Sequence, residues 1–375
     1  MRIGVPAETK RGEHRVAITP AGVRELTLAD HEVRIQSGAG HGSSLTDDDY
    51  VRAGGRVVAD AETAWGEADL VLKVKEPTPE EHRLLRADLT LFTFLHLAAS
   101  KELTEALAAS GCTAMAYETV RDADGGLPLL APMSEVAGRM ATQVGAHLLA
   151  APAGGRGVLL GGVSGVMPAH VVVIGAGSSG HNAAWVAAGM EADVTVLDID
   201  VGTLRGIDQI QQGRVRTLTS NQLTLEEQVA LADLVIGAVL VPGARAPVLI
   251  SEEMVASMPR GSVLVDVSVD QGGCAATTRM TTHDDPTYEV DGVIHYCVGN
   301  MPGAMPRTST YALTNVTLPY AVRLAEQGIR GATRADPGLA AGVNVTEGAV
   351  VEPGVADAHG LAHTPLEQIW GGHQH

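Results

Sequence analysis

Short apolar runs alternate with amphipathic stretches through the first third of the chain. Runs rich in valine, isoleucine and leucine predict buried β-strands, and the stretches between them show the three- and four-residue spacing of helices. A helix is also expected to begin at Thr19-Pro20, with the threonine as N-cap and the proline as first helical residue. Strands that alternate with helices indicate a parallel sheet covered on both faces. The expected strands are 2–6, 33–35, 56–58, 70–74, 89–94 and 113–117, and the expected helices are 47–53, 60–66, 79–86 and 100–109.

The same alternation of strands and helices continues in the middle of the chain. A long helix is expected at 133–151, followed by a glycine-rich loop at 154–168. A polar, irregular stretch is expected at 271–292, and a long helix at 307–327. The pattern predicts a second, doubly wound sheet of about six strands with helices in the gaps. These strands are expected at 171–174, 194–197, 215–218, 234–238, 263–267 and 293–298.

The stretch 169–198 joins a strand, a glycine turn, a helix and a second strand that ends in an acid. The turn reads Gly175-Ala176-Gly177-Ser178-Ser179-Gly180, which matches the G-x-G-x-x-G pattern of dinucleotide-binding units. In that pattern the glycines allow a tight turn, a close approach to a pyrophosphate, and close helix–strand packing. Asp198, about 20 residues on, can bind both ribose hydroxyls and would repel a 2′-phosphate, which favours NAD over NADP. The alternative interpretation is a purely structural glycine turn.

The length of 375 residues exceeds what one hydrophobic core normally spans, so two domains are expected. The helix at 307–327 cannot simply extend the second sheet, and we expect it to return to the first domain. The predicted fold is therefore α/β with two Rossmann-like domains. A doubly wound parallel-sheet NAD domain at 129–305 is expected to be inserted into a discontinuous substrate domain formed by 1–128 and 306–375.

Composition narrows the choice of partners and compartment. The net charge of −18 disfavours nucleic acid and anionic membranes as partners. The chain starts without a charged-then-apolar leader and has no apolar run of about 18 residues, so we expect neither a signal peptide nor a spanning helix. Its 3 cysteines are odd in number and widely spaced, as is typical of reduced thiols. We expect a cytoplasmic protein.

Ligands of open α/β sheets bind beyond the carboxyl ends of the strands, and four polar residues fall there. Arg15 follows the first strand, and Lys75, His96 and Asp270 lie at or just after the ends of three later strands. A cation pair for a carboxylate, a histidine for proton transfer and a further carboxylate would suffice for hydride chemistry on a small oxo or amino acid. Each also has a structural interpretation, namely a surface charge, a solvated strand end, a core histidine and a turn cap, respectively.

The tripeptide His283-Asp284-Asp285 resembles a set of metal ligands. It lies in a turn beside Pro286, and the sequence offers no evident partner cluster. We therefore expect a structural role for it and no metal site.

A set of segments spread over nearly the whole chain is more specific than any single motif. They read RIGVPAETKRGEHRVAITPAGV, VLKVKEP, LFTFLHLAA, MSEVAGRMA, VVIGAGSSG, LPY and the long block 265–315 that begins VDVSVDQGGC. Together they resemble the corresponding segments of the L-alanine dehydrogenases. That family is related to the alpha subunit of proton-translocating nicotinamide nucleotide transhydrogenase.

The resemblance implies an activity in which L-alanine, NAD⁺ and water give pyruvate, ammonium and NADH reversibly. It implies that Arg15 and Lys75 bind the substrate, that His96 is the acid/base, and that Asp270 is the second catalytic group. It further implies homohexamers and a split substrate domain. The NAD-binding positions that it implies are Ser134, Gly175, Ala176, Gly177, Ser178, Ser179, Gly180, Asp198, Ser220, Val239, Leu240, Val267, Asn300 and Met301.

One position departs from the family pattern, and alternative functions stay open. Directly after the glycine turn this chain has His181-Asn182, where the family more often has an Asn-Ala pair. This difference bears on the affinity for the cofactor rather than on which cofactor is bound. One alternative is a transhydrogenase-like nucleotide-binding subunit, which would need a membrane partner. Another is a non-catalytic NAD-binding protein, which predicts a damaged Arg/Lys/His/Asp set. Saccharopine-type dehydrogenases share the architecture, but the block 265–315 does not resemble theirs.

Overall fold

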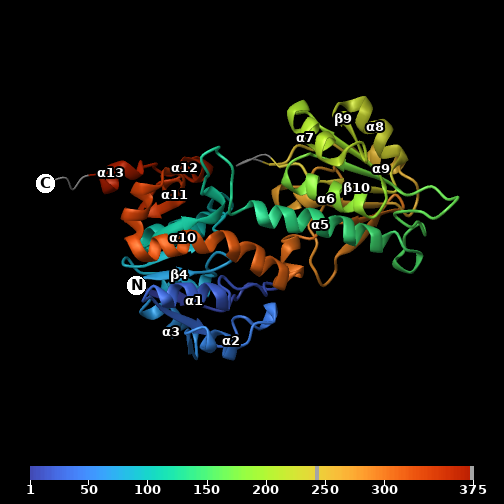
Figure 1. Ribbon diagram of the computed structural model, residues 1–375. Coiled ribbons are helices and arrows are strands. Elements are labelled where there is room, and N and C mark those ends of the chain that lie inside the picture. The colour runs from blue at the N-terminus through green and yellow to red at the C-terminus, as the bar shows by residue number, and fades with distance from the viewer. Residues whose placement is uncertain (241–244, 372–375) are drawn as a thin grey trace. The chain divides into compact units, whose positions relative to one another are not determined.

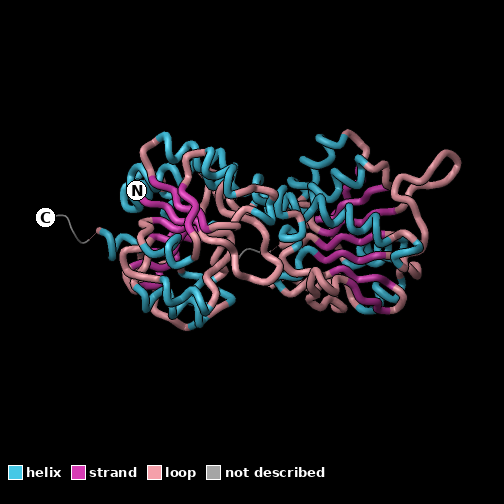
Figure 2. The backbone as a smooth tube through the Cα atoms, turned by 90° about the horizontal axis from the view of Figure 1, so that it is seen from below, coloured by secondary structure: helices cyan, strands magenta, loops and turns pink. Residues whose placement is uncertain are grey.

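The computed structural model describes residues 1–240 and 245–371, which form two compact units. The first unit contains Met1–Met133 and the described residues from Met305 onward, and the second contains Ser134–Ala304. In each unit a largely parallel sheet is packed with helices (Figures 1 and 2). The predicted α/β class with two Rossmann-like domains is thereby confirmed. Among the described residues, no helix combines the length and the apolar character needed to cross a membrane.

The first unit is built on eight strands in the order β15-β14-β6-β5-β4-β1-β2-β3. Its strands are β1 (Arg2–Val5), β2 (Glu32–Gln36), β3 (Arg56–Val58), β4 (Leu70–Leu72), β5 (Thr90–Thr93), β6 (Thr113–Ala116), β14 (Val343–Thr346) and β15 (Ala349–Val350). Its helices are α1 (Pro20–Leu28), α2 (Asp47–Arg52), α3 (Ala61–Gly66), α4 (Lys101–Ser110), α10 (Pro306–Ala335), α11 (Pro337–Ala340), α12 (Pro353–His359) and α13 (Leu366–Trp370). Short 3₁₀ turns are η1 (His41–Ser43), η2 (Pro79–Leu84), η3 (Leu97–Ala99) and η4 (Tyr117–Thr119).

The second unit is built on seven strands in the order β12-β13-β11-β10-β7-β8-β9. Its strands are β7 (His170–Ile174), β8 (Asp193–Asp198), β9 (Val215–Thr219), β10 (Leu234–Gly237), β11 (Val263–Asp266), β12 (Thr287–Val290) and β13 (Val293–Tyr296). Its helices are α6 (Ser178–Gly189), α7 (Val201–Gln211), α8 (Gln222–Leu231) and α9 (Glu252–Ser257), with turns η5 (Ala151–Ala153), η6 (Val267–Gln271) and η7 (Met301–Ala304). The boundary between the units falls within the first turn of α5 (Ala131–Leu148).

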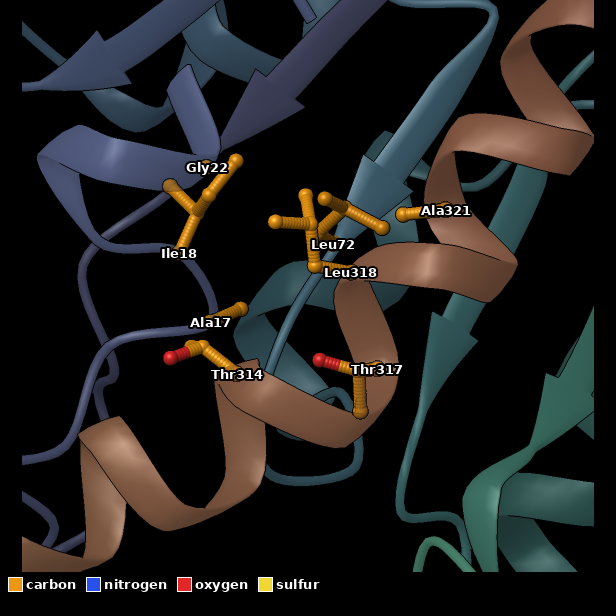
Figure 3. A pocket seen from close by; sticks show the side chains of 8 residues that line it. All are labelled: Ala17, Ile18, Gly22, Leu72, Thr314, Thr317, Leu318 and Ala321. Atoms are coloured by element: carbon orange, nitrogen blue, oxygen red, sulfur yellow. The ribbon is translucent and has the colours of Figure 1, made fainter. Parts of the chain in front are cut away.

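Helix α10 packs onto the first unit through small and apolar side chains. In Figure 3, Leu318 and Ala321 of α10 face Ile18, Gly22 and Leu72 across a small pocket. A Cβ atom on Gly22 would lie 3.2 Å from the Leu318 side chain and 2.8 Å from that of Ile18, so glycine permits this close approach. This apolar contact explains why α10, which begins 278 residues after α1 ends (306 − 28), completes the same core. Each Å² of apolar surface buried there contributes about 25 cal/mol.

Buried hydroxyl groups tie the start of α10 to the loop after β1. Thr310 Oγ1 accepts a hydrogen bond from the nitrogen of Val16 at 3.1 Å and lies 2.8 Å from Ser43 Oγ. Ser43 and Thr310 are both buried, so each of these bonds satisfies a polar group that has left water. Helix α10 is therefore fixed in register against the first unit as well as packed on it.

The structure corrects several element predictions. Strand β12 lies inside the stretch 271–292 that was expected to be irregular, and it pairs antiparallel with β13. Strands β14 and β15 were not expected, and η2 replaces the helix expected at 79–86. Helix α10 continues to Ala335, but Gly328 adopts φ 68° and interrupts it, so the first helical segment ends where predicted. The expected range of the first domain ends at residue 375, and residues 372–375 lie outside the described residues.

The close contact of β1 with α3 yields a prediction for stability. A Cβ atom added to Gly4 would lie 2.1 Å from the Ala64 carbonyl oxygen, which is backbone and cannot move aside cheaply. We expect Gly4→Ala to lower the free energy of unfolding by about 1–3 kcal/mol or more. The measurement is the denaturant or thermal midpoint at matched protein concentration.

Gly66→Ala is the matched control, because a Cβ atom there would meet nothing within 4 Å. It should leave the midpoint unchanged or raise it slightly. Equal midpoints for the two variants would contradict the packing argument.

Candidate active site

Three strands of the first unit bring the predicted substrate residues to one edge of the sheet. β1 pairs in parallel with β4, and β4 pairs in parallel with β5. The loops that leave these three strands therefore start side by side at their carboxyl ends. They carry Arg15, Lys75 and His96, respectively.

Arg15 is held by the carboxylate of Glu13, which was not among the predicted site residues. Its Nε and Nη2 atoms donate to Glu13 Oε1 and Oε2 at 2.7 and 2.5 Å, and its Nη1 atom donates to Met133 Sδ at 3.0 Å. The two side chains are only 2% and 1% exposed. Burial alone would raise the pKa of Glu13, but the hydrogen bonds and charge of Arg15, with a smaller contribution from Lys75, lower it to about 2. The guanidinium group thus has a fixed orientation before any ligand arrives.

Lys75 is held through its backbone rather than through its ammonium group. Its nitrogen lies 3.4 Å from Glu8 Oε1, which also accepts from the nitrogen of Val74 at 2.6 Å. Thr93 Oγ1 donates to the Lys75 carbonyl oxygen at 3.0 Å. Burial, and next the charge of Arg15, lower the pKa of Lys75. An ammonium group that is desolvated next to a second cation is a strong binder for a carboxylate or an oxo group.

His96 has a left-handed backbone conformation, with φ 50° and ψ 39°, and its side chain is 48% exposed. For a residue other than glycine this conformation costs about 1–3 kcal/mol and persists only where the surrounding structure imposes it. The His96 ring is stacked on that of Phe94 at a centroid distance of 5.7 Å. Its Nδ1 atom lies 3.8 Å from Glu76 Oε2.

Glu76 is a charged neighbour of the His96 ring. Burial alone would raise its pKa, but His96, Lys10 and Lys75 hold the pKa well below the usual range of a glutamate. Glu76 therefore stays ionised and also forms an ion pair with Lys10. A cavity of about 370 Å³ lies here and is lined by Glu76, His96, Lys10 and His82, among others.

The glycine turn of the second unit has the shape that a pyrophosphate needs. Gly175 has φ 100°, and a Cβ atom there would lie 2.5 Å from the carbonyl oxygen of Ala238. A Cβ atom on Gly180 would lie 1.8 Å from the Gly175 carbonyl oxygen, so only glycine lets α6 pack this closely. Among the described residues, a Cβ atom on Gly177 would meet nothing within 4 Å, and no side-chain cap bond is formed at the start of α6. The N-terminus of a helix with such space in front of it fits a dinucleotide phosphate.

The remaining predicted residues of this loop surround the turn. Asp198 ends β8, and its Oδ2 atom accepts from the nitrogen of Ala176 at 2.6 Å. The nitrogen of Ser220 donates to the Asp198 carbonyl oxygen at 2.9 Å, and Ser179 Oγ donates to the Ser134 carbonyl oxygen at 3.0 Å. Ser178 is the first residue of α6. The structure therefore brings Ser134, the glycine turn, Asp198 and Ser220 together.

Other predicted residues follow the neighbouring strands of the same sheet. Val239 and Leu240 come just after β10, and Val267 begins η6 directly after β11. β10 is paired in parallel with β7 and with β11, so all three positions lie at the edge that carries the glycine turn. Leu240 is exposed.

Asp270 and Asn300 form a separate contact within the second unit. The nitrogen of Asn300 lies 3.3 Å from both carboxylate oxygens of Asp270, and Asn300 has φ 56°. Asp270 is exposed, whereas Met301 is buried. Any contact of Met301 with a ligand would thus involve little of its side chain. His283 Nε2 lies 3.3 Å from the Asn300 carbonyl oxygen, and within residues 1–240 and 245–371 no three metal-ligating side chains come together.

Family models match both parts of the chain. The family model for the alanine dehydrogenase/PNT N-terminal domain matches residues 4–137, and that for the C-terminal domain matches residues 141–353. The chain belongs to the alanine dehydrogenase/PNT family. The resemblance expected from the sequence segments is therefore confirmed.

Individual members of the alanine dehydrogenase/PNT family match over nearly the whole chain. An alanine dehydrogenase of Mycolicibacterium smegmatis is 56% identical over 369 residues, which is 98% of this chain and 100% of that protein. A solved L-alanine dehydrogenase matches with a TM-score of 0.93 and 52% identity, covering 96% of this chain and 99% of that one. A transhydrogenase from Sinorhizobium meliloti matches with a TM-score of 0.80 and 25% identity, covering 94% and 99% of the two chains.

The Glu13–Arg15 pair predicts how stability depends on pH. Because the pKa of Glu13 falls from 4.5 to about 2 in the folded chain, its ionised form stabilises the fold above the unfolded pKa. This stabilisation, of order 3 kcal/mol, should be lost as the pH falls from about 4.5 toward 2. The measurement is urea unfolding of the natural chain and of Glu13→Gln between about pH 6 and pH 3.

Above about pH 5, the free energy of unfolding of the natural chain should exceed that of Glu13→Gln by a constant amount. This difference should become smaller as the pH falls below about 5. A margin that does not change with pH would contradict the assigned role of the carboxylate.

Proposed function

We propose that the chain is an NAD-dependent L-alanine dehydrogenase. The reaction converts L-alanine, NAD⁺ and water into pyruvate, ammonium, NADH and a proton, and it is reversible. The observation that supports this most directly is the convergence of Arg15, Lys75 and His96 at one sheet edge of a chain that shares 52% identity with an L-alanine dehydrogenase of known structure.

In this proposal each unit has its own task. The substrate domain is 1–128 with 306–375, and the NAD domain is 129–305. The glycine turn binds the pyrophosphate, and Asp198 binds the ribose hydroxyls. Ser134, Ser220, Val239, Leu240, Val267, Asn300 and Met301 complete the cofactor site.

When bound, NAD⁺ would supply the acceptor for the hydride of the substrate Cα atom. The side chains of the protein bind the substrate and move protons. Arg15, held rigid by Glu13, binds the substrate carboxylate, while Lys75 binds the oxo oxygen that forms. His96 and Asp270 move protons when water adds to the imine carbon and when ammonia leaves. Proton transfer by a placed side chain contributes about 10²–10⁴ in rate.

The proposal extends to the quaternary structure of the protein and to its compartment in the cell. We infer a homohexamer in the cytoplasm that acts in L-alanine catabolism. The family resemblance supports the hexamer, and the net charge of −18 supports a soluble setting. The three cysteines are free thiols, which supports a reducing compartment.

The transhydrogenase match gives a second candidate, a nucleotide-binding subunit that does not oxidise alanine. Its support is weaker, because its identity to this chain is 25% against 52% for the alanine dehydrogenase structure. The ordered Arg15, Lys75 and His96 set would also have no task in such a subunit.

Turnover itself is tested by absorbance at about 340 nm with NAD⁺ and L-alanine at alkaline pH. We expect NADH formation with L-alanine and little with D-alanine, and little with NADP⁺ because Asp198 would repel its 2′-phosphate. Glycine and serine serve as further substrates for comparison. Binding of NADH without any turnover would favour the transhydrogenase-like candidate.

His96→Ala tests the acid/base assignment. We expect kcat to fall by about 10²-fold or more while NADH affinity and thermal stability stay close to those of the natural chain. His41→Ala, at an exposed histidine of η1 in the same unit, is the control and should retain full turnover. Near-normal turnover of His96→Ala would remove His96 from the chemistry.

A further inference from the structure

Glu118 binds two consecutive backbone amides in the turn that carries His96. The nitrogen of His96 donates to Glu118 Oε1 at 2.6 Å. The nitrogen of Leu95 lies 3.2 Å from Oε1 and 3.3 Å from Oε2. Hydrogen bonds from amides to a carboxylate are charge-assisted and stronger than those between neutral groups. One side chain thus holds the backbone on the N-terminal side of the histidine.

The local fold explains why these amides need such an acceptor. Strand β5 ends at Thr93, and the nitrogen of Phe94 still donates to the carbonyl oxygen of Val74. The next two amides, those of Leu95 and His96, donate to Glu118 instead of to the neighbouring strand. Glu118 comes from η4, directly after the parallel neighbour β6, so it emerges at the same sheet edge.

The backbone of His96 gives an independent reason for a clamp. Its φ of 50° and ψ of 39° are unfavourable for a residue with a Cβ atom, so the surroundings must impose them. The contacts of the ring with Phe94 and Glu76 act on the side chain. On the backbone, the carbonyl oxygen of His96 accepts from the nitrogen of Ala99 at 2.9 Å, which leaves the amide side to Glu118.

We propose that Glu118 is a positioning residue for proton transfer, because it fixes the left-handed turn that aims the His96 ring. This inference rests on the proposed function, in which His96 is the acid/base. A reacting group that is misplaced by about 1 Å can lose about 10²-fold in rate. In this role Glu118 acts through the backbone amides of Leu95 and His96, from which it accepts hydrogen bonds.

A double-mutant cycle separates this role from general structural support. Glu118→Ala should lower kcat by about 10²-fold in the natural chain, with KM for L-alanine changed much less. In the His96→Ala background the same substitution should change kcat by less than about twofold, because the group that it positions is gone. An equal loss in both backgrounds would overturn the proposal.

Two further variants sharpen the comparison. Glu118→Gln keeps a carbonyl oxygen where Oε1 accepts both amides, so it should restore most of the turnover that Glu118→Ala loses. Asp47→Ala is the matched control, since Asp47 Oδ1 accepts the Gly38 amide at 2.9 Å in the same unit but is not part of the His96 turn. Loss of turnover in Asp47→Ala as large as in Glu118→Ala would count against a specific role.

Amide hydrogen exchange tests the clamp without relying on activity. In a peptide containing Leu95 and His96, exchange should be faster in Glu118→Ala than in the natural chain and in Glu118→Gln. Unchanged exchange in Glu118→Ala would overturn the proposal even if turnover fell. Absent turnover in the natural chain would instead refute the proposed function, and the exchange result would still decide on the clamp.

Discussion

Lys73 places a fully buried ammonium group between two buried carboxylates of the first unit. Its Nζ atom lies 3.1 Å from Glu8 Oε2 and 3.0 Å from Glu81 Oε1. Burial alone would lower the pKa of Lys73, but the two carboxylates raise it, so the lysine stays charged. Removing Lys73 would leave two buried carboxylates without their shared counter-charge, at a cost of about 3–5 kcal/mol.

These three ionised side chains also order the sheet edge that carries Lys75, because Glu8 makes a second set of contacts. Its other oxygen accepts the amides at Val74 and Lys75, where β4 has already ended. The loop after β1, the end of β4 and η2 are thus joined by one set of charges. Two further carboxylates act in the same way: Glu13 fixes the Arg15 guanidinium group, and Glu118 fixes the backbone of His96. The first unit thus uses buried acids to preorganise the candidate site.

Sequence patterns anticipated the parts of the fold that depend on local spacing. Thr19 caps α1, and the side chain accepts from the nitrogen of Gly22 as its position before Pro20 indicated. The glycine turn, α6 and Asp198 also occur where the motif predicted them. Strand β14 was missed because its partner β6 is more than 220 residues earlier in the chain, and no local pattern records that pairing.

The candidate site was anticipated to a similar extent. Arg15, Lys75 and His96 could be found because polar residues at strand ends are conspicuous. Glu8, Glu13 and Glu118 could not be found in this way, because a glutamate in a polar loop resembles any solvated acid until the fold places it beside an amide or a guanidinium. The E-x-R spacing of Glu13 and Arg15 was the one local signal available.

As an L-alanine dehydrogenase, this chain moves a hydride from the Cα atom of L-alanine to a nicotinamide. Turnover with L-alanine deuterated at Cα, followed by mass spectrometry of the reduced cofactor, measures this transfer directly. We expect each NADH formed to carry one deuterium. NADH formed without deuterium, or labelled alanine recovered with its deuterium exchanged and no NADH formed, would contradict it.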